Sequence, residues 1–272
     1  MCRNLLTLAE IVILAVVAVA QQPPKTSDQP AQDPDAPIAN PGRPTVSTPA
    51  TLTPVGYFQF ESGVLGAWTS PEFSSQTSAN EVIKFAVCRR IELLAGVEPV
   101  AHSIFGGPSS DDAGGVSLGV QGVLYPGEGA KPTIAASYFH SVYGGNAPDL
   151  DIGSSTNSAL LLASADLGKF HYDANAFLNE VVIDPIRRTQ FGQSLSVSHP
   201  LTTRLGLSGE IWHFTQPFIR GNAVGNLWAL SYSATKDLVF DAGFDHGLTN
   251  TSTHWEILAG FTYLLPRRLS PH

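Results

Sequence analysis

The sequence predicts an all-β fold: a transmembrane antiparallel up-and-down β-barrel of about twelve strands, preceded by a disordered N-terminal segment. Three observations predict it. Apolar and polar residues alternate over stretches of roughly nine to thirteen residues, whereas soluble strands usually have about five or six and membrane-crossing strands about 9–11. Short turns alternate with long polar loops, and amphipathic aromatic residues gather at the strand ends.

The first 20 residues are typical of a secretory signal peptide. Arg3 stands near the start, an apolar run begins at Ile11, and Ala18-Val19-Ala20 forms a small-x-small cleavage site. About ten uninterrupted apolar residues are too few for a helix that spans a bilayer, which needs roughly 20. We therefore expect export, with the bacterial outer membrane as the destination.

Residues 21–54 are rich in Pro, Gln, Ser, Thr and Ala and have few large apolar side chains. Such a segment buries too little surface to fold, so we expect a disordered linker. The barrel is then expected over residues 55–265, with a C-terminal tail at 266–272.

From residue 55 onward no long stretch keeps the helical spacing of apolar residues, and period-two alternation predicts strands throughout. The expected strands cover residues 55–68, 80–88, 90–100, 114–124, 132–142, 157–166, 169–179, 189–198, 203–214, 223–235, 237–246 and 254–265. Their connections are mostly tight at one end and long and polar at the other, as in outer-membrane barrels with periplasmic turns and extracellular loops. An even strand number then leaves both ends of the barrel on the short-turn side.

The closing hairpin indicates which face meets lipid. Leu238, Phe240 and Phe244 fall on one side of its first strand, and Asp241 and Asp245 on the other. In a membrane barrel the apolar face meets hydrocarbon and the polar face a lumen, while closure pairs the backbone N–H and C=O groups.

The same alternation predicts a set of lumen-lining residues as a candidate solute pathway. An acidic, water-filled lumen favours cationic or neutral solutes over anions. The alternative is that these charges pair across strands, as Lys84 could with Glu61 or Glu92, and fill a closed barrel. The predicted set is Glu61, Lys84, Glu92, Glu98, Gln121, Asp173, Arg204, Glu210, Asp241, Asp245 and Glu256.

Aromatic residues predict the two membrane interfaces. A soluble sandwich has no need of Trp residues at one level, whereas a membrane barrel has a girdle at each interface. The predicted girdles comprise Trp68, Trp212 and Trp255 at the long-loop end and Tyr57, Tyr125, Tyr232 and Tyr263 at the short-turn end.

Composition restricts the partners. Charged residues are only 14% of the chain and the net charge is −8, which argues against nucleic acid because phosphate binding needs Lys and Arg clusters. The eight histidines are scattered without metal-ligand spacing, so no metal and no cofactor are expected. The expected partners are the lipid bilayer with its lipopolysaccharide, the barrel assembly machinery and a small-molecule solute.

Catalysis is not expected. Gly115-Val116-Ser117-Leu118-Gly119 matches the G-x-S-x-G pattern, but that nucleophile elbow needs a strand–turn–helix context and here lies within an alternating strand. An outer-membrane lipase-type enzyme remains a minor alternative, because barrels host such sites and Ser198 and His199 are adjacent.

The closing hairpin also resembles a known family. The segment Asp241–Leu248, a short polar loop and the segment Trp255–Tyr263 are similar to the last hairpin of bacterial outer-membrane β-barrel proteins described as transporters or as proteins of the phenol meta-cleavage pathway. The resemblance implies an outer-membrane barrel for passive passage or binding of small solutes, hydrophobic or aromatic ones among them. It departs from the usual barrel ending, because residues 266–272 follow the last strand. Two alternatives stay open: a non-conducting structural or adhesion barrel, and a soluble secreted β-sandwich.

Overall fold

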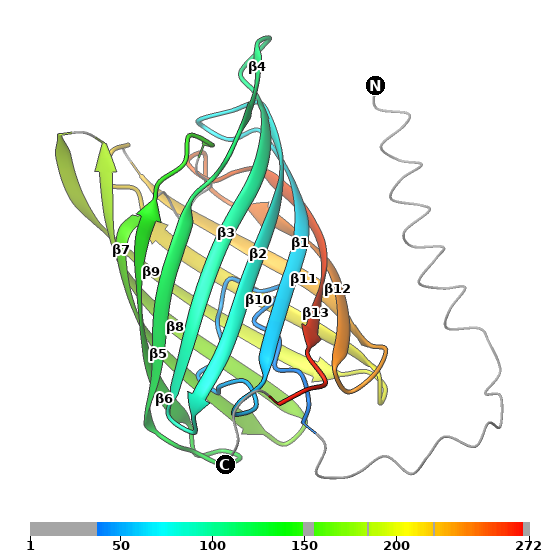
Figure 1. Cartoon of the computed structure of the whole chain (residues 1–272). Helices are drawn as coiled ribbons and strands as arrows, with labels where there is room; N and C mark the ends of the chain where they lie inside the picture. Colours follow the sequence, from blue (N-terminus) through cyan, green and yellow to red (C-terminus); the bar gives the residue numbers. More distant parts are fainter. Residues whose placement is uncertain (1–36, 149–154, 184, 220, 269–272) are drawn as a thin grey trace. The chain divides into compact units, whose positions relative to one another are not determined.

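The computed structural model describes residues 37–148, 155–183, 185–219 and 221–268. The fold class is confirmed: these residues form an all-β, closed antiparallel barrel (Figure 1). Among them, no helix is long and apolar enough to cross a membrane. The strands are β1 (Phe58–Trp68), β2 (Ser75–Cys88), β3 (Ile91–Ile104), β4 (Ser109–Asp112), β5 (Val116–Tyr125), β6 (Thr133–Tyr143), β7 (Ser155–Leu167), β8 (Phe170–Ile183), β9 (Ile186–Pro200), β10 (Leu205–Thr215), β11 (Asn222–Ser233), β12 (Leu238–Gly247) and β13 (Trp255–Leu264).

Twelve of these strands make the wall, each antiparallel to its sequence neighbour in the ring. The pairing of β1 with β13, from Gln59↔Leu264 to Trp68↔Trp255, closes the cylinder. Closure leaves the wall without a free edge, which is the condition for placing a sheet in hydrocarbon. Because Gln59 and Leu264 lie beside each other, the wall begins and ends at the same end of the barrel.

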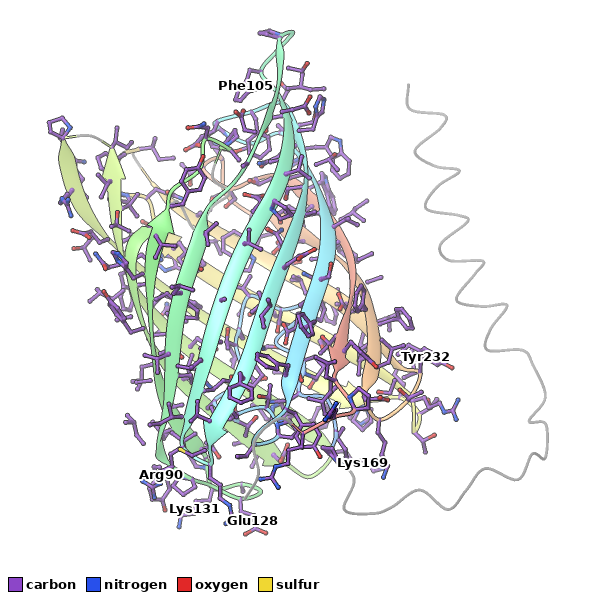
Figure 2. All side chains as sticks on the ribbon, viewed as in Figure 1. Arg90, Phe105, Glu128, Lys131, Lys169 and Tyr232 are labelled. Carbon is purple, nitrogen blue, oxygen red and sulfur yellow. The ribbon has the colours of Figure 1, made fainter. Side chains whose placement is uncertain are left out.

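The two ends differ as the sequence predicts, with one addition. Arg90, Lys131 and Lys169 mark the short-turn end in Figure 2, and Phe105 marks the opposite end. There, β3 continues beyond its pairing with β5 and forms a hairpin with β4 that projects from the wall (Figure 1). The expected loops were too long at this end, since β2 begins at Ser75 and β8 and β9 extend to Ile183 and Ile186. β-branched residues in 181–186 favour continued strand pairing there.

The faces of the wall are inverted relative to a soluble protein. In the closing strands, Phe240, Phe244 and Ile257 are exposed on the outside, and Asp241 and Asp245 are buried inside. Exposed large apolar side chains occur on every wall strand, far beyond the apolar patch that a soluble monomer tolerates. This distribution suits a barrel whose outer face meets lipid.

Glycines opposite aromatic residues shape the wall. A Cβ on Gly225 would lie 2.3 Å from the Trp212 ring, and a Cβ on Gly192 would lie 2.2 Å from the Phe214 ring. Each glycine is the direct cross-strand partner of its aromatic residue. The glycines therefore let these rings lie flat against the wall instead of filling the lumen.

Candidate functional site

The main feature of the lumen is a segment of residues 39–54, here called the inner collar, which precedes β1 and lies inside the barrel. Figure 1 shows it in blue within the wall, toward the short-turn end. Following the chain, the collar contacts Asp241 on β12, then Glu210 on β10, and finally Glu92 on β3 before β1 begins. It thus follows the inner circumference of the barrel.

Side chains of the wall hold the collar: some accept hydrogen bonds from its backbone N–H groups, and others donate to its backbone carbonyls. Glu210 accepts from the N–H groups of Val46 and Ser47, each at 2.7 Å, and from the Ser47 hydroxyl at 2.5 Å. Further contacts involve Gln59 and Glu61 on β1, Ser194 on β9, Asn175 on β8, Ser164 on β7, Gln121 on β5 and Glu92 on β3.

The collar closes on itself. The Asn40 side-chain amide donates to the Thr51 carbonyl at 3.0 Å and to the Thr51 hydroxyl at 3.2 Å, which joins the two ends of the segment. The Asn40 N–H donates to Gln59 Oε1 at 2.8 Å, and Gln59 Nε2 donates back to the Asn40 carbonyl at 2.7 Å. Because both ends are fixed to each other and to β1, the collar is a ring that narrows the lumen.

Two ion pairs lie beside the collar. Lys84 Nζ is 2.6 Å from Glu61 Oε1, and both side chains are buried. Arg43 of the collar reaches Asp241 at 3.4 Å. Its guanidinium lies over Gly63 and Gly260, where a Cβ would come within 2.2 Å and 2.7 Å of it. The pairing of Lys84 with Glu61 is the one anticipated for a filled barrel, whereas Glu92 pairs with the collar residue Thr53 instead.

The remaining predicted lumen residues lie at different levels along the barrel axis. Asp173 accepts from the Ser164 hydroxyl, which itself accepts from the Ala50 N–H, so this carboxylate supports the collar indirectly. Asp245 and Glu256 lie farther toward the long-loop end, directly opposite each other on β12 and β13. Glu98 lies where β3 changes its register with β2 and leaves the wall for the β4 hairpin.

An apolar cluster occupies the other side of the lumen. Phe177, Trp212 and Phe214 pack together with ring centroids 5.2 Å and 6.0 Å apart, and Leu162 is fully buried beside them. Ala50 of the collar belongs to the same cluster. The inward aromatic side chains therefore gather on β8 and β10, beside the carboxylates Asp173 and Glu210 of the same strands.

Three predicted positions are wrong. Trp212 does not belong to a girdle: it is 3% exposed, and its Nε1 donates to Asp245 at 2.6 Å inside the barrel. Trp212 comes two residues after Glu210 in the same strand, so both side chains face inward. Tyr57 precedes β1 and packs against the buried cluster of Ala39 and its neighbours. Arg204 is exposed in the turn before β10, where Thr202 accepts from its N–H, so it does not line the lumen.

The other girdle residues lie on the outer face near the strand ends. Trp68 and Trp255 are direct partners at the long-loop end. Tyr125, Tyr232 and Tyr263 lie near the short turns, and Figure 2 shows Tyr232 there.

The collar is the element that sequence reasoning missed. Its polar, proline-rich composition has no apolar periodicity, so we expected it to be disordered, and residues 37–54 instead make specific contacts with the wall. A signal did exist: eight inward carboxylates were predicted against two cations, and buried carboxylates need donors. The collar backbone supplies them to Glu61, Glu92 and Glu210. The predicted signal peptide, residues 21–36 of the linker and residues 269–272 of the tail lie outside the described residues.

Among the described residues, no group of three or more His, Cys, Asp or Glu side chains is arranged to hold a metal ion. Cys88 is an exposed free thiol at the short-turn end of β2. Ser198 and His199 are directly paired with β10 near the short turns.

Comparisons with known proteins place the fold. No family model and no curated protein sequence matches the chain. The structure is similar to an outer-membrane channel from Pseudomonas putida F1, with a TM-score of 0.58 at 14% identity over 79% of this chain and 98% of that one. It is also similar to the KdgM porin, with a TM-score of 0.50 at 11% identity over 79% of this chain and 99% of that one. The chain therefore has the fold of bacterial outer-membrane channels, and these two neighbours are a channel and a porin, not enzymes.

Proposed function

We propose that this protein is an outer-membrane barrel through which small solutes pass passively, with the inner collar as the narrowest part of the path. The observation that carries the proposal is the inverted wall: apolar side chains outside and a polar, collar-lined lumen inside. The fold shared with two outer-membrane channels supports it.

The charges of the lumen support a preference for cations or neutral solutes over anions. Glu61, Glu92, Glu210 and Asp241 surround the collar, whereas the cations there are Lys84 and Arg43. In a narrow tube with low-dielectric walls, such an excess of one sign repels anions.

The aromatic side of the lumen supports a small apolar or aromatic solute, in keeping with the family that the closing hairpin resembles. Trp212, Phe214 and Phe177 form an apolar cluster with Ala50 of the collar, so the inside of the barrel is not polar all round. An apolar cluster beside the path is compatible with the passage of a small apolar solute.

Planar-bilayer recording tests the proposal. We expect discrete current steps and, in a salt gradient, a reversal potential that indicates cation preference. Asp241→Asn should reduce that preference, because Asp241 faces the lumen. Glu81→Gln is the matched control, since Glu81 is an exposed carboxylate on the outer face of β2, opposite Ser62 of β1.

A barrel that inserts but passes no current would overturn passive passage. It would favour the alternative of a non-conducting structural or adhesion barrel, whose exposed β3–β4 hairpin would be its contact surface. An anion-selective reversal potential would overturn the proposed selectivity.

A further inference from the structure

The outer face of the barrel carries a groove of ≈ 520 Å³ that crosses β7 to β10. Its lining includes three consecutive residues from each of β7, β8, β9 and β10, such as Ala174-Asn175-Ala176. The middle residue of each triplet faces the lumen and is buried, so it contributes backbone to the floor. The outer residues are therefore the walls of a groove open to the membrane side.

Strand register shows how the groove arises. One row of directly paired residues consists of Ile134, Ala163, Ala174, Leu195 and Ile211. The row beside it consists of Leu161, Ala176, Gln193, His213 and Val224. Alanines on β7 and β8 leave a depression between larger neighbours. Four inter-strand steps make it about 19 Å long.

The groove runs obliquely between the two girdles. At one end, Ile134 is the direct partner of Tyr125 in the short-turn girdle. At the other end, Ile211 is followed along the same row by Asn226, His246 and finally Trp255 of the long-loop girdle. The depression thus lies within the hydrocarbon layer and rises toward the long-loop interface.

Two polar side chains line the upper part of the groove. Gln193 and His213 are directly opposite each other on the outer faces of β9 and β10. Gln193 is exposed and His213 is partly exposed, so both side chains can be reached from the membrane side. The His213 Nδ1 atom itself is covered by protein and has no hydrogen-bond partner among the described residues, so a lipid group would contact the accessible part of the imidazole. His213 is two residues from the long-loop end of β10, near the level where lipid chains meet their polar linkages.

We propose that this groove binds an acyl chain of lipopolysaccharide, the lipid of the outer leaflet, and that His213 and Gln193 hydrogen-bond the polar end of that chain. An acyl chain with a polar linkage matches both parts of the groove, the alanine-lined depression and the polar pair of His213 and Gln193. A flexible hydrocarbon chain fills the alanine-lined depression, and an ester or hydroxyl oxygen reaches the imidazole and the amide. The proposal rests on the outer-membrane location and not on whether the lumen conducts.

Retention of lipopolysaccharide after mild detergent extraction tests this proposal, with the bound lipid measured per barrel by mass spectrometry. Ala174→Leu fills the groove, and His213→Leu removes its hydrogen-bonding atom. We expect each to lower retained lipopolysaccharide by roughly tenfold, the size expected for the loss of about one buried hydrogen bond or of comparable packing. Ala259→Leu is the matched control, because Ala259 is a small outward residue of β13 outside the groove and pairs with Ala242.

Heat-modifiable migration on gels checks that each variant is a closed barrel. Equal retention by the groove variants, the control and the unaltered protein would overturn the proposal. So would a dimer that Ala174→Leu dissociates, because the groove would then be an interface between copies of the chain. Equal retention of phospholipid from membranes without lipopolysaccharide would overturn the assignment of the lipid.

Discussion

Strand β10 places Glu210 inside the barrel and His213 outside it, and the two side chains differ in their hydrogen-bond partners. Glu210 receives three hydrogen bonds from the collar, so its burial is compensated entirely within the chain. His213, three residues on, has a buried Nδ1 without a partner among the described residues. Glu210 therefore has its hydrogen-bond partners within the chain, whereas His213 has a ring nitrogen without one. This difference predicts opposite effects of removing the polar group at these two positions.

The largest effect is expected from Glu210→Leu. Two collar N–H groups, those of Val46 and Ser47, would lose their acceptor inside the barrel, whereas the Ser47 hydroxyl would keep its hydrogen bond with Ser194. Each unsatisfied buried donor costs about 1–3 kcal/mol, so we expect a loss of roughly 3–5 kcal/mol in the free energy of unfolding. Urea unfolding from lipid vesicles measures it. Limited proteolysis should show cleavage in residues 39–54 before the wall unfolds, and unchanged protection there would contradict a collar held by Glu210.

A smaller loss is expected from Lys84→Met. The buried Glu61 would lose its ion pair, although the Gly42 N–H and the Gln59 amide would still donate to it. Removal of one partner of a buried pair costs about 3–5 kcal/mol, and the remaining donors reduce this to roughly 2 kcal/mol. The same unfolding experiment measures the loss. The exposed pair of Arg187 and Glu180 serves as control, since Arg187→Met should change stability by less than about 1 kcal/mol.

The smallest effect, and of opposite sign, is expected from His213→Leu in phospholipid vesicles without lipopolysaccharide. Replacing an unpaired polar ring by an apolar side chain on the lipid face should stabilise the barrel by up to about 1 kcal/mol. Urea unfolding from these vesicles measures the change in the free energy of unfolding. A loss comparable with that of Glu210→Leu would mean that His213 has a structural partner within the protein and that the two faces do not differ.

The wall could be predicted from the sequence because its signal is local. Alternation in the closing hairpin and the short turns near Arg90 and Lys169 determine strands, faces and order, since a strand that crosses a bilayer must alternate along its whole length. Trp212 lies near a strand end, as a girdle residue would, but it is two residues after Glu210 and therefore faces the inside of the barrel.

The residues of the collar do not themselves predict its position, because nothing in their sequence differs from a disordered linker. Its position depends on contacts between residues far apart, such as the Ser47 N–H with Glu210 and the Ala50 N–H with Ser164. Those contacts use backbone N–H groups, which every non-proline residue has, so they leave no pattern of residue types. Likewise, the pairing of Arg43 with Asp241 joins positions that only barrel closure brings together.

Disulfide trapping between the collar and the wall tests whether the collar lies inside the barrel. The hydroxyls of Ser47 and Ser194 are 2.8 Å apart inside the barrel, so Ser47→Cys with Ser194→Cys should form a disulfide when Cys88 is replaced by Ser. We expect mass spectrometry to find a cross-linked peptide that joins the collar to β9, and to find none when Ser47→Cys is combined with Ser62→Cys on the outer face of β1. Absence of the 47–194 cross-link, together with rapid labelling of residue 47 by a bulky water-soluble thiol reagent, would contradict a collar inside the lumen.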